Sequence, residues 1–338
     1  MSAFTAHRLR FEGRAETPIL LADHQGAAIR GALFHALRGR PDRPGFCLCP
    51  ARPHCRGCPS LAGCPVSFLL ATVDDGGRRG GDVPRPYTVE PPLEAHGDYR
   101  PGDPFQFGLT VFARALSLFP YVVVAARRLE DEGIGRPIRD GRGLARPGRF
   151  RLERLVAANP LAGAEQVVLQ RGDDLVSVPA VPVTHDLVLA RAAALAARWP
   201  GAAGTLTLEF LSPTRLVEGG RLLRGPAFRP LVQRLFERLS SLWERYGGEE
   251  LPIDFGDLLA RAAGVRLVAD ATRWIAVRGY STRQEAPKRL DGFAGRATYE
   301  GDLRPLLPWL IWGEVTHAGK DAVKGCGLYR IVEAGGLL

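Results

Sequence analysis

The residues best suited to chemistry lie near the C-terminus, in the glycine-rich stretch G-E-V-T-H-A-G-K-D-A-V-K-G-C-G-L-Y-R at 313–330. Glycine tolerates a positive φ and the close approach of another backbone, so this stretch could wrap an anion with its own N–H groups. Lys320 and Lys324 add positive charge, and His317 titrates near neutral pH. The pattern favours an anion-binding loop, with a plain turn before the last strand as the alternative. Its glycines are Gly313, Gly319, Gly325 and Gly327.

Five of the six cysteines crowd together between positions 47 and 64, which favours a metal site over disulfides in a reducing compartment. Turns rich in proline and glycine allow four thiolates to converge on one ion, and tetrahedral Zn²⁺ is the default. Four protein ligands leave no open position, so we predict a structural zinc. Its predicted ligands are Cys49, Cys55, Cys58 and Cys64, with Cys47 as the alternate first ligand. An iron–sulfur cluster and a set of free thiols are the alternatives.

A helix is expected at 25–38, in H-Q-G-A-A-I-R-G-A-L-F-H-A-L-R, with Asp23 as its N-cap. Two glycines inside this helix suggest close packing or the close approach of a ligand. Arg30 and Arg38 are available there to bind phosphate. His35, judged by residue type alone, is more often structural than catalytic.

A second cluster lies in the segment R-G-Y-S-T-R-Q-E-A-P-K-R-L-D-G-F, expected as a hairpin between two strands. It mixes an aromatic and an amide with cations, and single-stranded RNA recognition needs stacking together with phosphate contacts. A solvated hairpin tip is the alternative. The candidate RNA-binding residues are Tyr280, Arg283, Gln284, Lys288 and Arg289.

The elements expected around these residues divide the chain into two halves. The second half has strands near 205–211, 265–279, 290–299 and 328–332, and helices near 228–246, 254–263 and 303–312. This order is β-α-β-β-α-β, the ferredoxin-like unit. The first half fits an α+β domain with inserted loops, in which 133–148 is a loop and 174–179 a strand. Residues 184–200 are expected to connect the two halves.

Composition limits the class of protein and its partners. The chain has 338 residues, 46% hydrophobic and 24% charged, which is a globular balance rather than a disordered one. Its net charge of +9, mostly from arginine, favours a polyanionic partner, although an arginine-rich composition can also reflect a GC-rich genome. No apolar stretch reaches the length of about 20 residues that spans a bilayer, and no secretion signal is visible. We therefore expect a soluble, cytoplasmic protein with no membrane partner.

Three segments in order resemble the CRISPR-associated repeat endoribonucleases of the RAMP superfamily, which cut precursor CRISPR RNA. They are I-R-G-A-L-F-H-A-L-R with the cysteines that follow, R-G-Y-S-T-R-Q…L-D-G-F-A-G…Y-E-G-D-L, and H-A-G-K…K-G-C-G-L-Y-R-I. The resemblance is specific from about 280 to 331 and general over 65–200. It implies an α+β protein of tandem ferredoxin-like (RRM-like) domains that hold CRISPR repeat RNA between them. The expected domains are 1–195, with the cysteine-rich insertion at 46–65, and 200–338, with the glycine-rich loop at 313–327.

The resemblance also implies metal-independent cleavage, in which a ribose 2′-OH attacks the adjacent phosphate and leaves a 2′,3′-cyclic phosphate. Such an enzyme needs no cofactor for catalysis and can stay bound to its product. That chemistry requires a base, an acid and cations around the phosphorane. Many relatives carry a catalytic histidine on the first helix, which favours His35, and His317 is its competitor. Lys320 would stabilise charge, and Tyr280 or Tyr299 could orient a water or the ribose.

An alternative function within the same superfamily remains open. A related RAMP subunit could bind guide RNA inside a CRISPR effector complex, with other Cas proteins as partners, without cutting the RNA. The presence of both His35 and His317 favours the enzyme.

Overall fold

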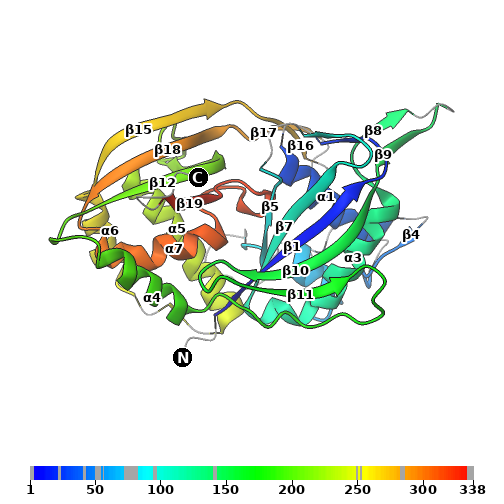
Figure 1. Cartoon of the computed structure of the whole chain (residues 1–338), viewed down its shortest axis with the longest axis horizontal. Helices are drawn as coiled ribbons and strands as arrows, with labels where there is room; N and C mark the ends of the chain where they lie inside the picture. Colours follow the sequence, from blue (N-terminus) through cyan, green and yellow to red (C-terminus); the bar gives the residue numbers. More distant parts are fainter. Residues whose placement is uncertain are drawn as a thin grey trace. The chain divides into compact units, whose positions relative to one another are not determined.

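The computed structural model divides the chain into two compact units, shown in Figure 1. The N-terminal unit comprises His7–Ala158 and Glu165–Pro182, and the C-terminal unit comprises Met1–Ala6, Asn159–Ala164 and Val183–Leu338. The structure describes residues 4–21, 24–40, 43–49, 55, 57–71, 83–93, 97–139, 143–248, 250–251, 253–281 and 286–332, and only the backbone of 279–281 and 286–288.

The N-terminal unit is built on a five-stranded sheet with the order β11-β10-β1-β7-β5. Its strands are β1 (Ala6–Ala15), β5 (Tyr87–Glu90), β7 (Pro104–Phe112), β10 (Phe150–Asn159) and β11 (Ala164–Gln170). Its helices are α1 (Gln25–Arg38), α2 (Pro65–Leu70) and α3 (Phe119–Glu132). Short strands lie around them: β2 (Ile19–Leu20), β3 (Gly39–Arg40), β4 (Arg43–Pro44), β6 (Asp98–Tyr99), β8 (Ile134–Arg139) and β9 (Ala145–Gly148). Without β11, the main strands follow the order fourth, first, third, second.

Alternation along β1 separates a core face from a charged face in this sheet. Leu9 and Phe11 are buried, whereas Arg8, Arg10 and Glu12 between and beside them are partly exposed. Phe11 stacks on Phe107 of β7 with ring centroids 4.7 Å apart. The burial follows from the period-2 pattern of a strand with one side on the core.

The C-terminal unit is built on a four-stranded sheet with the order β15-β18-β12-β19. Its strands are β12 (Gly204–Thr214), β15 (Arg266–Ile275), β18 (Gly292–Gly301) and β19 (Tyr329–Val332), with the small strands β13 (Val217–Glu218), β14 (Arg221–Leu222), β16 (Arg278–Ser281) and β17 (Ala286–Arg289). Its helices are α4 (His185–Ala196), α5 (Phe228–Leu242), α6 (Phe255–Ala263) and α7 (Leu307–Thr316). Chain order and strand order together give the predicted β-α-β-β-α-β arrangement, with α6 added.

Aromatic side chains fill the core of the C-terminal unit. Phe4, from the start of the chain, stacks on Trp243 with ring centroids 4.4 Å apart. Trp243 meets Trp312 of α7 edge-on at 5.5 Å. The indole N–H of Trp312 donates to His185 Nδ1 at 3.1 Å, which fixes the start of α4 against α7. Residues 184–200, expected as a connection, therefore contain a helix that belongs to this core.

Two further expectations for the N-terminal unit are corrected by the structure. Residues 133–148, expected as a loop, contain the β8–β9 hairpin, in which Ile138 pairs with Arg146. Residues 174–179 form no strand. They run beside β11 instead, where the Ser177 N–H donates to the Val168 carbonyl oxygen at 2.8 Å. Among the described residues, no helix combines the length and hydropathy that a bilayer crossing requires.

Candidate functional site

The glycine-rich loop joins α7 to β19 and folds back onto the end of β12. The Ala318 N–H donates to the Gly327 carbonyl oxygen at 3.0 Å, and the Gly327 N–H donates to the Pro213 carbonyl oxygen at 3.1 Å. Several loop residues have a positive φ, which reverses the chain repeatedly. They are His317 (60°), Gly319 (82°), Asp321 (61°), Gly325 (86°) and Gly327 (71°). The loop is thus a compact, internally bonded structure.

Two of its glycines are required by packing within the protein. A Cβ on Gly319 would lie 2.5 Å from the Arg215 carbonyl oxygen. A Cβ on Gly327 would overlap the Ala318 carbonyl oxygen. Close approach of protein backbone therefore explains both positions without a ligand. On the preceding helix, a Cβ on Gly313 would overlap the hydroxyl of Tyr329.

His317 caps the C-terminal end of α7 and lies in the interior. The backbone N–H of His317 donates to the Gly313 carbonyl oxygen at 2.9 Å, and the whole residue is buried. An imidazole in that position does not face the solvent from which an RNA would approach. The structure thus favours His317 as a support of the loop over His317 as the group that touches a phosphate.

The two loop lysines differ in exposure. Lys320 is exposed, and its backbone N–H donates to the Arg215 carbonyl oxygen at 2.9 Å. Lys324 Nζ lies 3.1 Å from Asp321 Oδ1 and is mostly buried. Of the two lysines, Lys320 is therefore the one whose side chain is accessible to solvent.

The predicted hairpin consists of β16 and β17, which pair Gly279 with Lys288 and Tyr280 with Pro287. Arg283 and Gln284 lie outside the described residues, as does Asp23, the predicted N-cap of α1. For Tyr280 and Lys288 only the backbone is described. Arg289 is exposed, with its Nε 2.7 Å from Asp291 Oδ2. Tyr299, by contrast, is fully buried in β18, and its hydroxyl donates to the Pro226 carbonyl oxygen at 2.8 Å.

His35 lies in the last turn of α1, which begins at the N-cap His24, whose Nδ1 accepts from the Ala27 N–H at 3.1 Å. The imidazole of His35 is half-buried, and this burial lowers its pKa below 6.5. The positive charges of Arg40, Arg30 and Arg38 lower that pKa further. Arg30 also stacks its guanidinium over the Phe34 ring at 5.4 Å. The end of α1 thus combines a histidine that is neutral at pH 7 with nearby guanidiniums.

The cysteine cluster does not support the predicted zinc. Across the described residues, no group of three or more His, Cys, Asp and Glu side chains is arranged to hold a metal ion. Cys64 is buried at the start of α2, and the Cys49 Sγ lies 3.6 Å from the Ser60 Oγ. Burial raises the pKa of Cys55, and so do the neighbouring thiols of Cys47, Cys64 and Cys58. The thiols are near one another, but they do not form a ligand set, and we assign no metal.

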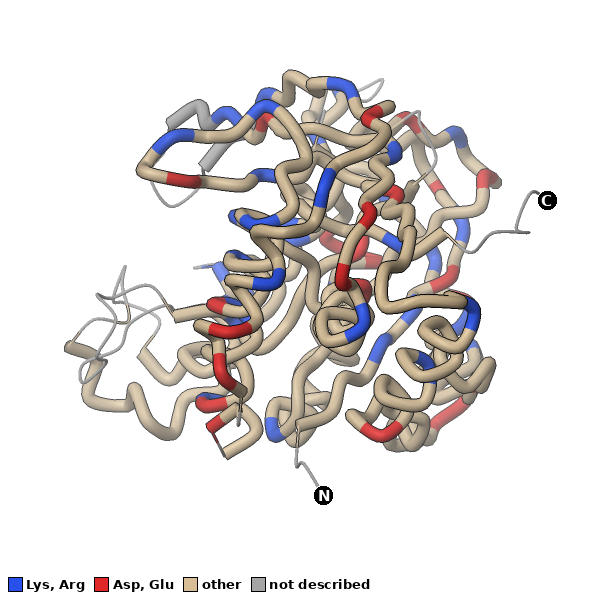
Figure 2. Tube along the Cα trace, turned by 90° about the vertical axis from the view of Figure 1, so that its left-hand side faces the viewer, with Lys and Arg blue, Asp and Glu red and all other residues tan. Residues whose placement is uncertain are grey.

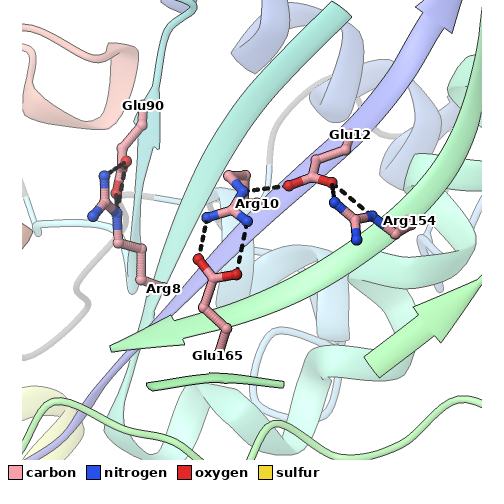
Figure 3. A network of polar contacts seen from close by, with 6 residues as sticks. All are labelled: Arg8, Arg10, Glu12, Glu90, Arg154 and Glu165. Atoms are coloured by element: carbon pink, nitrogen blue, oxygen red, sulfur yellow. Dashed lines mark hydrogen bonds and ion pairs between the residues drawn. The ribbon is translucent and has the colours of Figure 1, made fainter. Parts of the chain in front are cut away.

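On the charged face of the N-terminal sheet, Arg8, Arg10 and Arg154 are each paired with a glutamate, as Figure 3 shows. Glu12 accepts from Arg10 Nε at 2.5 Å and from Arg154 Nε at 2.8 Å, and Arg10 also donates to Glu165 at 2.8 Å. Figure 2 shows acidic and basic positions interleaved along the chain. Nearby carboxylates neutralise these guanidiniums, so they contribute less to phosphate binding than the net charge suggests.

Arg215 and its partners, Asp291 and Asp321, were not predicted from the sequence. Arg215 follows β12 and is 8% exposed. Its Nη1 donates to the Asp291 carbonyl oxygen at 2.6 Å, and its Nε lies 3.3 Å from Asp321 Oδ2. The only sequence signal is an arginine directly after a strand that ends in L-S-P-T.

Comparisons with known proteins identify related families and similar folds. Residues 4–181 match the family model of the AF_1859 N-terminal domain, and residues 208–329 match that of the CRISPR-associated endoribonuclease Cas6. No curated protein matches the sequence. Among solved structures, Thermus thermophilus Cas6 (TTHB231) is similar at a TM-score of 0.53 and 14% identity, covering 98% of this chain and all of that one. A chain of a partial Cas6-RT-Cas1–Cas2 complex is similar at a TM-score of 0.61 and 14% identity, covering 99% of this chain and 47% of that one.

At such identities the structural likeness speaks for the fold alone. The two family models are independent of it, and together they account for most of the chain, one over the helix that carries His35 and the other over the sheet that carries the glycine-rich loop. The chain therefore belongs to the CRISPR-associated, RAMP-type proteins that process repeat RNA, with a Cas6 endoribonuclease domain in its C-terminal half.

Proposed function

We propose that this protein binds CRISPR repeat RNA and cleaves precursor CRISPR RNA by metal-independent attack of a ribose 2′-OH on the adjacent phosphate. The products are a 2′,3′-cyclic phosphate and a 5′-hydroxyl, and the enzyme stays bound to the processed RNA. The observation that carries the proposal is the His35 imidazole, half-buried and low in pKa beside Arg30, Arg38 and Arg40. A neutral base beside fixed cations supplies two of the three kinds of group that this reaction needs.

The individual roles follow from exposure and charge. His35 Nδ1 or Nε2 takes the proton of the 2′-OH, and the guanidiniums beside it stabilise the charge of the phosphorane. As the bond between phosphorus and the 5′-oxygen breaks, that oxygen takes up a proton from the imidazolium or from water. Lys320 and the backbone N–H groups around Gly319, Gly325 and Gly327 bind the RNA backbone. Lys324 and the buried His317 hold that loop in shape.

The hairpin completes the proposed RNA-binding surface. Tyr280, Arg283, Gln284, Lys288 and Arg289 would contact bases and phosphates of the repeat, and Tyr280 would orient a water or the ribose. We propose that these residues set the choice of repeat, because stacking and amide contacts can discriminate between unpaired bases.

The domain organisation belongs to the same proposal. Apart from β11, both sheets have the strand order fourth, first, third, second, which supports tandem ferredoxin-like domains. Their expected ranges are 1–195 and 200–338, with α4 (His185–Ala196) packing in the core of the second domain. Partners are proposed from similar structures, since Cas6 (TTHB231) is solved as a product complex and another similar chain lies in a Cas6-RT-Cas1–Cas2 complex. Repeat RNA and other Cas proteins are therefore the expected partners of this protein.

The proposal is tested by incubating the protein with an end-labelled RNA of one CRISPR repeat from the source genome, in EDTA. We expect one cut and a cyclic phosphate on the 5′ fragment. Tight binding of RNA that stays intact would contradict cleavage and favour the guide-binding subunit instead. His35→Ala is expected to abolish the cut while RNA affinity persists, and His317→Ala to weaken binding. Normal cleavage by His35→Ala would remove this residue from the mechanism.

A further inference from the structure

A buried polar cluster lies beneath the glycine-rich loop, centred on Arg215. Arg215 and Asp291 are each 8% exposed, and the side chain of Asp321 is equally covered. The guanidinium reaches Asp321 Oδ2 through Nε at 3.3 Å and the Asp291 carbonyl oxygen through Nη1 at 2.6 Å. The guanidinium donates a hydrogen bond to a carbonyl oxygen on one side and forms an ion pair with a carboxylate on the other. It ties these two groups together, since the loss of either contact leaves a buried charged or polar group uncompensated.

One side of this cluster holds the loop. Asp321 has a left-handed backbone (φ 61°) and precedes the short 3₁₀ turn at Ala322–Lys324, whose Lys324 Nζ lies 3.1 Å from Asp321 Oδ1. The carbonyl oxygen of Arg215 accepts from the Lys320 N–H at 2.9 Å. Arg215 thus holds the two residues Lys320 and Asp321 at once, one through its backbone and one through its side chain.

The other side of the cluster holds the base of the β16–β17 hairpin. Asp291 Oδ1 accepts from the Val277 N–H at 2.9 Å, and Asp291 Oδ2 lies 2.7 Å from Arg289 Nε. The Leu290 N–H donates to the Val277 carbonyl oxygen at 2.9 Å. Asp291 therefore joins the strands that enter and leave the hairpin, and its own carbonyl oxygen is the atom that Arg215 binds.

Backbone packing brings the same elements together. The end of β12 lies between the loop and the start of β18, because a Cβ on Gly292 would be 2.6 Å from the Thr214 carbonyl oxygen. On the loop side, a Cβ on Gly319 would be 2.5 Å from the Arg215 carbonyl oxygen. Residues 213–215 are therefore in close backbone contact with both the glycine-rich loop and the start of β18.

We propose that Arg215 is a positioning residue that couples the glycine-rich loop to the β16–β17 hairpin, so that both grip the repeat RNA as one unit. This inference rests on the proposed function, because the two elements carry the proposed RNA contacts. Arg215 itself is buried and touches neither base nor phosphate. Arg215 fixes Lys320 relative to the hairpin before RNA arrives, so less conformational entropy is lost when RNA binds. We therefore expect Arg215 to affect RNA affinity.

The experiment compares Arg215→Met, Arg215→Lys and Asp321→Asn with wild type in single-turnover cleavage of the repeat RNA at increasing protein concentration. Half-saturation reports RNA binding and the plateau reports the cutting step. For Arg215→Met we expect half-saturation to rise roughly tenfold, equivalent to about 1.4 kcal/mol, with the plateau rate nearly unchanged. Arg215→Lys should lie between, because an ammonium reaches one acceptor where a guanidinium reaches two. The matched control is Arg229→Met, which removes an exposed arginine 3.7 Å from Glu218.

Amide hydrogen exchange in the free protein tests the coupling directly. Arg215→Met is expected to speed exchange at both the Lys320 and Val277 amides, whereas Asp321→Asn speeds it at Lys320 alone. Faster exchange at only one of the two amides in Arg215→Met, or unchanged half-saturation, would overturn the inference. If Arg215→Met fails to fold, the Asp321→Asn variant is used instead, because it keeps the contact between Arg215 and Asp291. Wild-type RNA affinity in Asp321→Asn would refute the coupling. A wild-type protein that neither binds nor cuts the RNA refutes the proposed function, while the exchange measurement still judges the coupling.

Discussion

Gly327→Ala tests whether the glycine-rich loop has the rigid packing that the structure gives it. Gly327 has a φ of 71°, and a Cβ there would overlap the Ala318 carbonyl oxygen, far inside the 3.0 Å limit of real Cβ contacts. Ala318 cannot retreat easily, because its N–H is bonded to the Gly327 carbonyl oxygen. The added methyl group must therefore break this bond or move the loop.

The size of the effect has two parts. The left-handed backbone costs a residue with a Cβ about 1–2 kcal/mol. Forcing a methyl group into a filled space adds about 1–3 kcal/mol. We therefore expect Gly327→Ala to lower the free energy of unfolding of the C-terminal unit by about 2–5 kcal/mol. Gly220→Ala is the matched control, since Gly220 has a φ of 78° in the same unit and open space where the methyl group would go.

The assay is urea unfolding of both variants, followed by tryptophan fluorescence, because Trp243 and Trp312 report on the core of the C-terminal unit. In the control variant Gly220→Ala, the free energy of unfolding should fall only by the cost of the left-handed backbone, about 1–2 kcal/mol. RNA affinity should fall for Gly327→Ala and stay at the wild-type value for Gly220→Ala. Equal destabilisation of the two variants would show that the packing against Ala318 does not matter, and would refute the account of the loop.

Three further predictions concern catalysis, binding and the core. The cleavage rate should rise with pH through a midpoint below 6.5, because the pKa of His35 is lowered and only the neutral imidazole accepts a proton; a midpoint above 6.5 would exclude it as the base. Lys320→Ala should reduce the slope of log affinity against log salt by about 1, measured by titration of repeat RNA, and an unchanged slope would place the lysine away from phosphate. Tyr299→Phe should cost about 1–3 kcal/mol in urea unfolding, because the Pro226 carbonyl oxygen loses its buried donor, with cleavage unaffected; a slower cut would give this tyrosine a role in the reaction.

The elements of the C-terminal unit could be predicted from the sequence because their signals are local. Leu231, Leu235, Leu239 and Leu242 recur at helical spacing, and all four are buried in or at the end of α5. The β8–β9 hairpin could not, since its strands contain glycine, proline and arginine and lie mostly exposed, which removes the alternation that marks a strand. A strand can be predicted from residue type and spacing only when one of its faces is buried, because only then do apolar and polar residues alternate along it.

The sequence predicts the environment of the candidate site residues less well than it predicts the elements. His35 and His317 look alike in the sequence, each beside glycines and cations, yet one is half-buried on a helix and the other is fully buried as a helix cap. That difference arises from residues far away in the chain, such as the end of β12 that covers the loop. Arg215 was missed for the same reason, because its partners lie 76 and 106 positions later and no local pattern connects them.

The ion pairs that the arginines form decide how much of the protein's positive charge is available to a polyanionic partner. On the C-terminal sheet, Glu209 binds Arg296 at 3.1 Å and Arg330 at 2.6 Å, just as Glu12 binds Arg10 and Arg154 on the N-terminal sheet. In both cases a glutamate on the first strand neutralises two guanidiniums from the sheet. A net charge of +9 therefore overstates the cations offered by the sheets. We therefore expect phosphate binding to depend on cations outside the sheets, such as Lys320 on the glycine-rich loop and the arginines around His35.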